Sequence, residues 1–159
     1  YVCLREMVTL KDFQENHKWI AKRIHPPISP QQVKEAIETL LELGLLRRNQ
    51  EGKLVQTEKF VHTEDQNTQI VEAYHFHEAM IDQARYALGH FKQEERHYYG
   101  LTIPLPKEMM QELIDEFYLF RDKVIEKVNQ KGLSFDEVYQ MNFQFFPLTK
   151  KKGEEGPHE

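Results

Sequence analysis

Apolar residues at three- and four-residue spacing predict a helix near the middle of the first sixty residues. Ser29 is a suitable N-cap, Pro30 suits the first helical position, and Gly44 is a suitable C-terminal stop. Between these signals one face is apolar and needs a covering partner. Its members are Val33, Ala36, Ile37, Leu40 and Leu41.

A short hairpin is predicted directly after this helix. Leu45 and Leu46 open a strand, residues 49–52 make a turn that contains glycine, and Leu54 and Val55 form the return strand. An earlier helix is predicted over residues 11–24, ended by two prolines, and residues 1–8 are read as the end of another. Helix, turn, helix and hairpin is the order of a winged helix, with the helix after Ser29 as its recognition helix.

Residues 68–91 carry the longest apolar repeat of the chain. Its steps alternate between four and three residues over three heptads, which predicts a long helix packed against another helix, of this chain or of a partner. The seam positions are Ile70, Tyr74, His77, Ile81, Ala84, Leu88 and Phe91.

The remainder of the chain predicts strand, helix and strand. Residues 97–103 and 135–146 show strand patterns, and the second ends in an alternation of Tyr139, Met141, Phe143 and Phe145 with polar residues. A helix is predicted over residues 107–131 between them, so the two strands should run parallel. The fold class is therefore α+β: a winged-helix module at 1–60, a helix-strand-helix-strand module at 61–149 with a linker at 60–67, and a mobile tail at 150–159.

Composition excludes several classes of protein. The 159 residues carry a net charge of -5, so no global positive field attracts nucleic acid. The single cysteine, Cys3, excludes a disulfide framework and a cysteine zinc site, and no stretch is long enough to span a bilayer. We expect a cytoplasmic protein without membrane contact, and, because the chain begins at Tyr1, a piece of a longer one.

Three blocks in order carry a resemblance to a known family. They are WIAKRI through KLVQT at 19–57, EER through LTI at 94–103 and VYQMNFQFFPLT at 138–149. The chain resembles the C-terminal domain of unknown function of a family of bacterial hypothetical proteins. The resemblance implies a winged helix plus α/β module, an upstream helical segment, and a grouping with helix-turn-helix transcription regulators. It implies no catalytic residues.

The predicted recognition helix is acidic. It carries one positive residue, Lys34, and three negative residues, Glu35, Glu38 and Glu42. The resulting net charge of -2 opposes contact with the phosphate backbone of DNA. Polar and basic residues around it still offer hydrogen bonds to bases and phosphates, or are simply solvated. These nucleic-acid candidates are Lys18, Lys22, Arg23, Gln31, Gln32, Lys34, Arg47, Arg48 and Lys53.

An anion or effector pocket is a further candidate site. Arg121 falls on an apolar seam and Arg85 lies beside one, so each needs a carboxylate partner, extends to the helix edge, or binds a ligand with Tyr139 and Phe143. The histidines do not have metal-ligand spacing, and we read His77 as a hydrogen-bonded core histidine.

No motif points to catalysis. The chain lacks a glycine-rich phosphate loop, a nucleophile with a positioned base and a metal signature, so we expect a non-enzyme without cofactor. We expect a homodimerising, effector-sensing or partner-docking domain of a bacterial transcription regulator, with DNA bound through an upstream segment or the wing. The alternatives are a protein-interaction adaptor without a nucleic-acid role and a small-molecule sensor.

Overall fold

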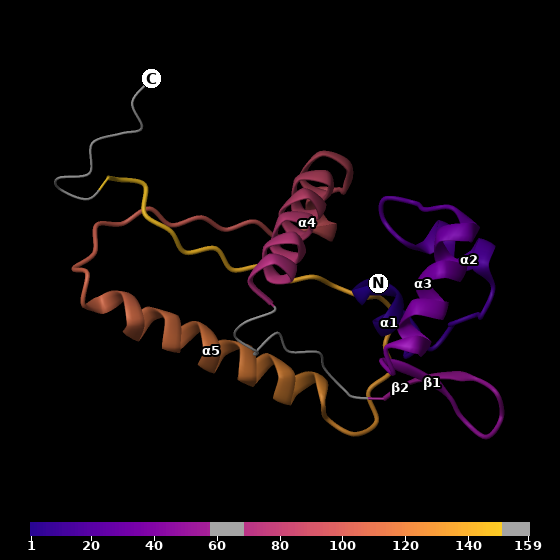
Figure 1. The fold of residues 1–159 in the computed structure, drawn as a ribbon. Coiled ribbons are helices and arrows are strands. Elements are labelled where there is room, and N and C mark those ends of the chain that lie inside the picture. Colours follow the sequence, from indigo (N-terminus) through magenta and orange to yellow (C-terminus); the bar gives the residue numbers. More distant parts are fainter. Residues whose placement is uncertain (58–68, 151–159) are drawn as a thin grey trace.

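Five α-helices, one 3-10 helix and one antiparallel pair of strands form the part of the chain that the structure describes, and the α+β class is confirmed (Figure 1). The computed structural model describes residues 1–57 and 69–150, with side chains in the fourth helix from Ala73 onward. The elements are α1 (Val2–Met7), α2 (His17–Arg23), α3 (Pro30–Glu42), β1 (Leu46–Arg48), β2 (Leu54–Gln56), α4 (Gln69–His90), η1 (Gln93–Glu95) and α5 (Met109–Val128).

Helix α3 begins and ends where its capping residues predict. The Ser29 hydroxyl accepts from the Gln32 amide at 3.2 Å, and the Gln32 side chain accepts from the Ser29 amide at 2.9 Å. This reciprocal box satisfies two backbone donors that a helix start leaves without partners. Gly44 follows the C-cap residue with φ +69°, a conformation that glycine adopts without strain.

The hairpin lies at the predicted position, and its two strands are antiparallel. Leu46 pairs with Gln56, and Arg48 pairs with Leu54. In the turn the Asn49 carboxamide oxygen accepts from the amides of residues 51 and 53 at 2.9 and 3.0 Å, while Gly52 has φ +77°. The hairpin therefore follows α3 directly along the chain.

Among the described residues, the fully buried apolar side chains all lie between residues 4 and 54. They come from α1, α2, α3, both strands and the connection between α1 and α2, so the first module has a core of its own. The members are Leu4, Met7, Leu10, Ile20, Ala21, Val33, Ala36, Ile37, Leu40, Leu46 and Leu54.

Helix α2 starts later than the sequence predicts. Asn16 is its N-cap, and the Asn16 carboxamide oxygen accepts from the amides of Lys18 and Trp19 at 2.9 and 3.1 Å. Phe13, which we placed in this helix, lies in the preceding loop and contacts the Trp19 ring edge-on, with centroids 6.1 Å apart. The apolar spacing therefore extends to residues that precede the first residue of the helix.

Arg5 is a buried charge that the sequence did not reveal. Its side chain is 1% exposed and forms an ion pair with Glu6. The Gln56 carboxamide donates to the Arg5 carbonyl at 3.0 Å and to the Glu6 carboxylate at 2.9 Å. These contacts connect α1 to the outer strand of the hairpin.

The described part of the second half contains both predicted helices but not the predicted pair of parallel strands. Within residues 69–150 no segment belongs to a strand, so the strands at 97–103 and 135–146 are corrected to extended segments. Both run in the same direction away from the first module (Figure 1). Two such segments without a third strand make at best a marginal sheet.

The chain returns to the first module after α5. Residue 135 forms an isolated parallel bridge with Leu10, the Lys11 amide donates to the Phe135 carbonyl at 3.0 Å, and Lys11 pairs with Asp136. Phe135 and Val138 pack against the core. Residues 135–138 thus complete the first module, while the division at residue 60 stays a prediction. The linker at 60–67 and the tail from residue 151 lie outside the described residues.

Candidate interaction surfaces

The exposed face of α3 carries paired, mostly negative side chains. The ammonium of Lys34 lies 3.8 Å from the Glu38 carboxylate, and the Gln31 carboxamide donates to Glu35 at 2.9 Å. Gln32 is held in the capping box described above. The predicted recognition helix therefore presents an acidic face on which Gln31, Gln32 and Lys34 already have partners within the helix or its cap.

Cations of the hairpin are also neutralised within the first module. Arg48 donates to both carboxylate oxygens of Glu15, at 3.1 and 2.6 Å, and to the Gly52 carbonyl at 2.7 Å. The hydrogen bond to Glu15 raises the pKa of the Arg48 guanidinium. Lys53 pairs with Glu51 at 2.9 Å. No local pattern points to Glu15, because it lies 33 residues from its partner along the chain.

Arg23 holds two parts of the fold together. Its guanidinium lies 3.5 Å from the Asp12 carboxylate, donates to the Asp136 carbonyl at 3.1 Å, and sits over the Trp19 ring at 5.7 Å. Its contacts explain its position without a ligand.

Three of the nine predicted nucleic-acid residues keep side chains without a polar partner in the described part of the chain. They are Lys18 and Lys22, one helical turn apart on α2, and Arg47 on β1. All three are exposed. Any phosphate contact by this module rests on them rather than on α3.

The second half exposes most of the large apolar side chains of the described chain. Of the 24 large hydrophobic residues that are exposed, 21 lie between Tyr74 and Leu148. No residue of this half is fully buried among those whose side chains are described. Monomeric proteins rarely leave so much apolar surface in one region.

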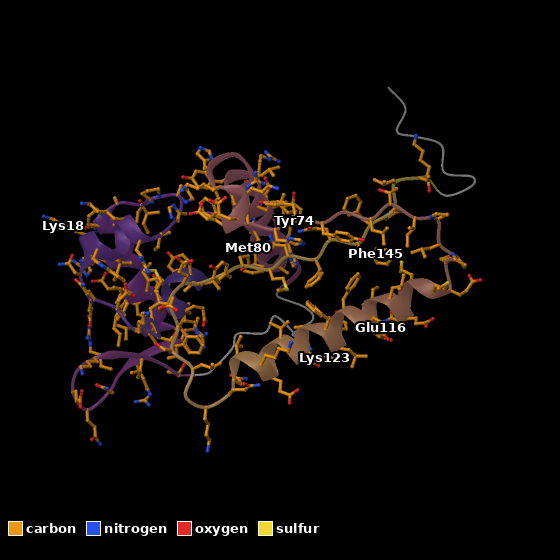
Figure 2. All side chains as sticks on the ribbon, turned by 180° about the vertical axis from the view of Figure 1, so that it is seen from behind. Lys18, Tyr74, Met80, Glu116, Lys123 and Phe145 are labelled. Atoms are coloured by element: carbon orange, nitrogen blue, oxygen red, sulfur yellow. The ribbon has the colours of Figure 1, made fainter. Side chains whose placement is uncertain are left out.

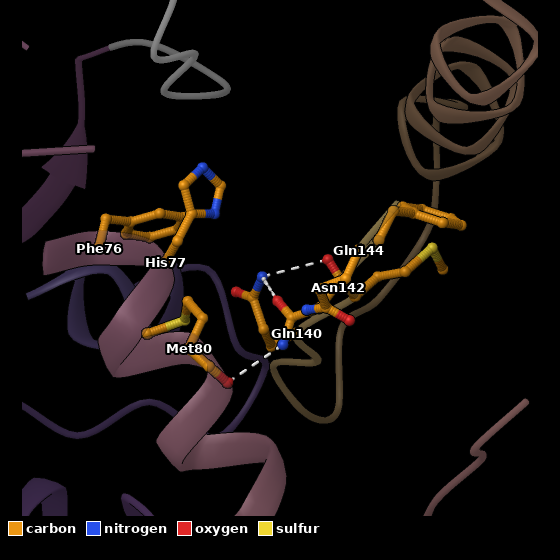
Figure 3. A pocket seen from close by; sticks show the side chains of 8 residues that line it. Phe76, His77, Met80, Gln140, Asn142 and Gln144 are labelled. Carbon is orange, nitrogen blue, oxygen red and sulfur yellow. Dashed lines mark hydrogen bonds between the residues drawn. The ribbon is translucent and has the colours of Figure 1, made fainter. Parts of the chain in front are cut away.

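One side of α4 contacts the C-terminal extended segment. The Asn142 carboxamide donates to the Met80 carbonyl at 3.1 Å, beside a small pocket of about 90 Å³ (Figure 3). Its lining residues are Phe76, His77, Met80 and residues 140–144. This segment covers the Met80 side of the helix.

Another side of α4 is open. Tyr74, Ile81 and Leu88 are 62%, 44% and 50% exposed, although all three lie on the predicted heptad seam. His77 is exposed as well, so the prediction of a core histidine is wrong: among the described residues it lies at the edge of the small pocket and is not enclosed by another helix. A groove of about 420 Å³ follows this face, lined by Tyr74, His77, Glu78, Ile81, Asp82 and Arg85.

Helix α5 packs its aromatic side chains against the same C-terminal segment (Figure 2). The Phe117 ring lies 5.4 Å from the Phe143 ring and 6.2 Å from the Phe145 ring, and Phe120 lies 5.8 Å from Phe143. This aromatic cluster is half exposed rather than enclosed.

The four residues predicted to form an effector pocket lie in different surroundings. Arg85 is on the α4 groove and pairs with Asp82 at 3.7 Å, whereas Arg121 pairs with Asp122 and stacks on the Tyr118 ring. Phe143 lines the small pocket, and neither cavity includes Arg121 or Tyr139. Neither of these two cavities is lined by all four residues, so the effector pocket stays a prediction.

No group of three His, Cys, Asp or Glu side chains in residues 1–57 and 69–150 is placed to hold a metal ion. None of the helices described has the length and apolar character that crossing a membrane requires.

Comparison with known proteins gives one match. The model of the family Domain of unknown function (DUF4423) matches residues 1–148. No curated protein and no solved structure matches the chain.

Proposed function

Because the chain belongs to the DUF4423 family, whose function is unknown, we propose from its geometry that it is a homodimerisation module of a transcription regulator. The observation that carries the proposal is the uneven burial of apolar side chains. The first module encloses its core, whereas the second half leaves its large apolar residues open to solvent. A second copy of the chain supplies the missing cover.

The regulator part of the proposal is supported by the first module. Its order of two helices and a hairpin is typical of a winged helix, a frequent element of DNA-binding proteins. The sequence blocks described above resemble a family grouped with such regulators. The acidic face of α3 opposes contact with the phosphate backbone, so in this proposal any DNA contact of the module involves the exposed cations of α2 and β1 rather than α3.

Mass measurement tests the dimer directly. We expect light scattering and sedimentation equilibrium at micromolar concentration to give twice the chain mass of 19.1 kDa. A single-chain mass throughout this concentration range would refute the homodimer.

A protein-interaction adaptor without nucleic-acid contact is the second candidate, favoured by the paired cations Arg48, Lys53 and Lys34. A mobility-shift titration with duplex DNA at increasing salt separates the two. For the regulator we expect a shift that weakens steeply with salt. The adaptor predicts no shift at any salt concentration.

A matched pair of variants makes the mobility shift specific. Replacing Lys18, Lys22 and Arg47 with alanine removes the three cations without partners and should abolish the shift. The control removes the same charge from exposed lysines elsewhere, at Lys107, Lys123 and Lys127, and should leave the shift unchanged. Equal losses in both variants would show that binding is non-specific.

A further inference from the structure

We propose that the open face of α4 pairs with the same face of α4 in a second copy of the chain, in antiparallel orientation, about a two-fold axis beside Asp82 and Gln83. The inference rests on the proposed homodimer and names the surface that forms it. Four observations carry it: the side of the helix that is open, its repeat, its lack of a partner helix, and its charges.

The open side of α4 is defined by what already covers the helix. Met80 faces the pocket formed with residues 140–144, and the Asn142 side chain is bonded to the helix backbone there. The other side carries the groove, whose lining includes the apolar Tyr74 and Ile81 and the charged Glu78 and Arg85. A partner therefore approaches on the side of Glu78 and Arg85.

The repeat on this side fits a helix. Tyr74, His77, Ile81, Ala84 and Leu88 follow the heptad spacing of helices that pack lengthwise on one another. An extended peptide or a flat surface does not match that period. The occupant is a helix with the same repeat.

Helix α5 of the same chain does not fill this role. Its Phe117 is packed against Phe143 and Phe145, and Arg121 interrupts its apolar side. Among the described elements, extensive helix and strand contacts involve only α1, α2, α3, β1 and β2. The remaining heptad seam of matching length is α4 of a second copy.

Charge fixes the orientation. Glu78 and Arg85 are seven residues apart and so lie on the same flank of the helix. In an antiparallel pair Glu78 of each copy lies near Arg85 of the other, which gives two opposite-charge contacts. A parallel pair would instead place these charges near Ala73 and Met80, where they gain no ionic partner.

The apolar layers of the antiparallel pair are compatible in size. Ile81 of one copy meets the small Ala84 of the other, and His77 meets Leu88. Alternation of large and small side chains lets two helices approach closely. His77, which is exposed in one chain, becomes covered in this arrangement.

Distances between spin labels on the two copies test the orientation. His75 and Asp82 occupy the same heptad position one repeat apart, and their side chains are 67% and 66% exposed, so a label at either site disturbs the fold equally little. Labels are attached to His75→Cys or Asp82→Cys in a Cys3→Ala background. With a rise of about 1.5 Å per residue, the labels at 82 are offset by about 2 Å along the axis and those at 75 by about 22 Å.

The expected result is a distinctly shorter distance for label 82 than for label 75. Equal distances at the two sites would show a parallel or unrelated contact and would overturn the inference, while the dimer itself would stand. A single-chain mass for the unlabelled protein would instead refute the proposed homodimer. The two failures are therefore distinguishable.

Charge exchange provides an independent test with a matched control. Glu78→Arg and Arg85→Glu should each raise the dimer dissociation constant by roughly three- to tenfold, and the double exchange should restore it. Glu116→Arg and Lys123→Glu make the same changes at exposed sites seven residues apart on α5 and should have no effect (Figure 2). Failure of the double exchange to restore dimerisation would overturn the charge pairing.

Discussion

Replacing Leu40 with alanine should destabilise the first module far more than the same substitution at Leu43. Leu40 lies in the last turn of α3 and is 1% exposed within the core, whereas Leu43 is the C-cap residue of the same helix and is 66% exposed. The pair therefore compares the same substitution at a buried and at an exposed position three residues apart.

The magnitude follows from what each side chain loses. Leu→Ala removes three carbon groups, each worth about 0.8 kcal/mol when buried. A cavity term adds to this at Leu40, so we expect the free energy of unfolding to fall by about 2–5 kcal/mol. At Leu43 the expected change is within about 0.5 kcal/mol.

Urea unfolding followed by tryptophan fluorescence is the suitable assay. Trp19 is the single tryptophan and packs against the core of the first module, so its signal reports that module. With a slope of about 1–3 kcal/mol per molar urea, Leu40→Ala should lower the midpoint by roughly 1 M or more. Equal midpoints for the two variants would refute the position of this core.

Three further predictions concern single groups. Asn16→Ala should lower the free energy of unfolding by about 0.5–2 kcal/mol because α2 loses its N-cap, whereas Asn16→Asp should retain most of it in the same urea assay. The hydrogen bond to Glu137 raises the pKa of Tyr139, so the stabilisation from this bond is fully present below the ordinary tyrosine pKa and is lost as the pH rises through the folded value. Glu137→Gln should therefore lower the Tyr139 pKa, measured by absorbance titration of tyrosinate. An unchanged titration would contradict the bond. Burial raises the pKa of the Cys3 thiol, so the free energy of unfolding should fall as the pH rises from 9.0, the ordinary cysteine value. Cys3 should also react with a disulfide reagent more slowly in the folded protein than in urea. Identical rates would show that the thiol is accessible.

The elements that the sequence predicted well are those fixed by neighbouring residues. Ser29, Pro30 and Gly44 determine α3, and Asn49 and Gly52 determine the turn, through contacts that span no more than four residues. Such signals are present in the sequence because the interacting groups are close along the chain. The predicted start and end of α3 are accordingly confirmed, and the hairpin lies where it is predicted, with its first strand beginning at Leu46 rather than Leu45.

Predictions that depended on hydrophobic period alone were less accurate. Phe13 continues the apolar spacing of α2, but the Asn16 cap starts the helix later and Phe13 packs from a loop. Residues 1–8 were too short for a pattern, which is why the buried Arg5 was missed. Hydrophobic periodicity indicates which residues face the core, but it does not show at which residue the helix begins.

Non-local contacts were the least predictable. Alternation correctly gave an extended backbone at residues 139–145, but strand pairing depends on a partner distant in sequence, and the described chain supplies none. The same reason explains the candidate site: Arg48 was assigned to phosphate because its Glu15 partner lies far along the chain.

The return of residues 135–138 to the first module has a consequence for synthesis on the ribosome. The contacts of Leu10 and Lys11 with Phe135 form only after residue 135 has been synthesised. The first module therefore stays incomplete until nearly the whole chain has been translated. Helices α4 and α5 therefore emerge while that unit still lacks its last layer, and a stop codon shortly after residue 60 would release a protein with one side of its interior uncovered.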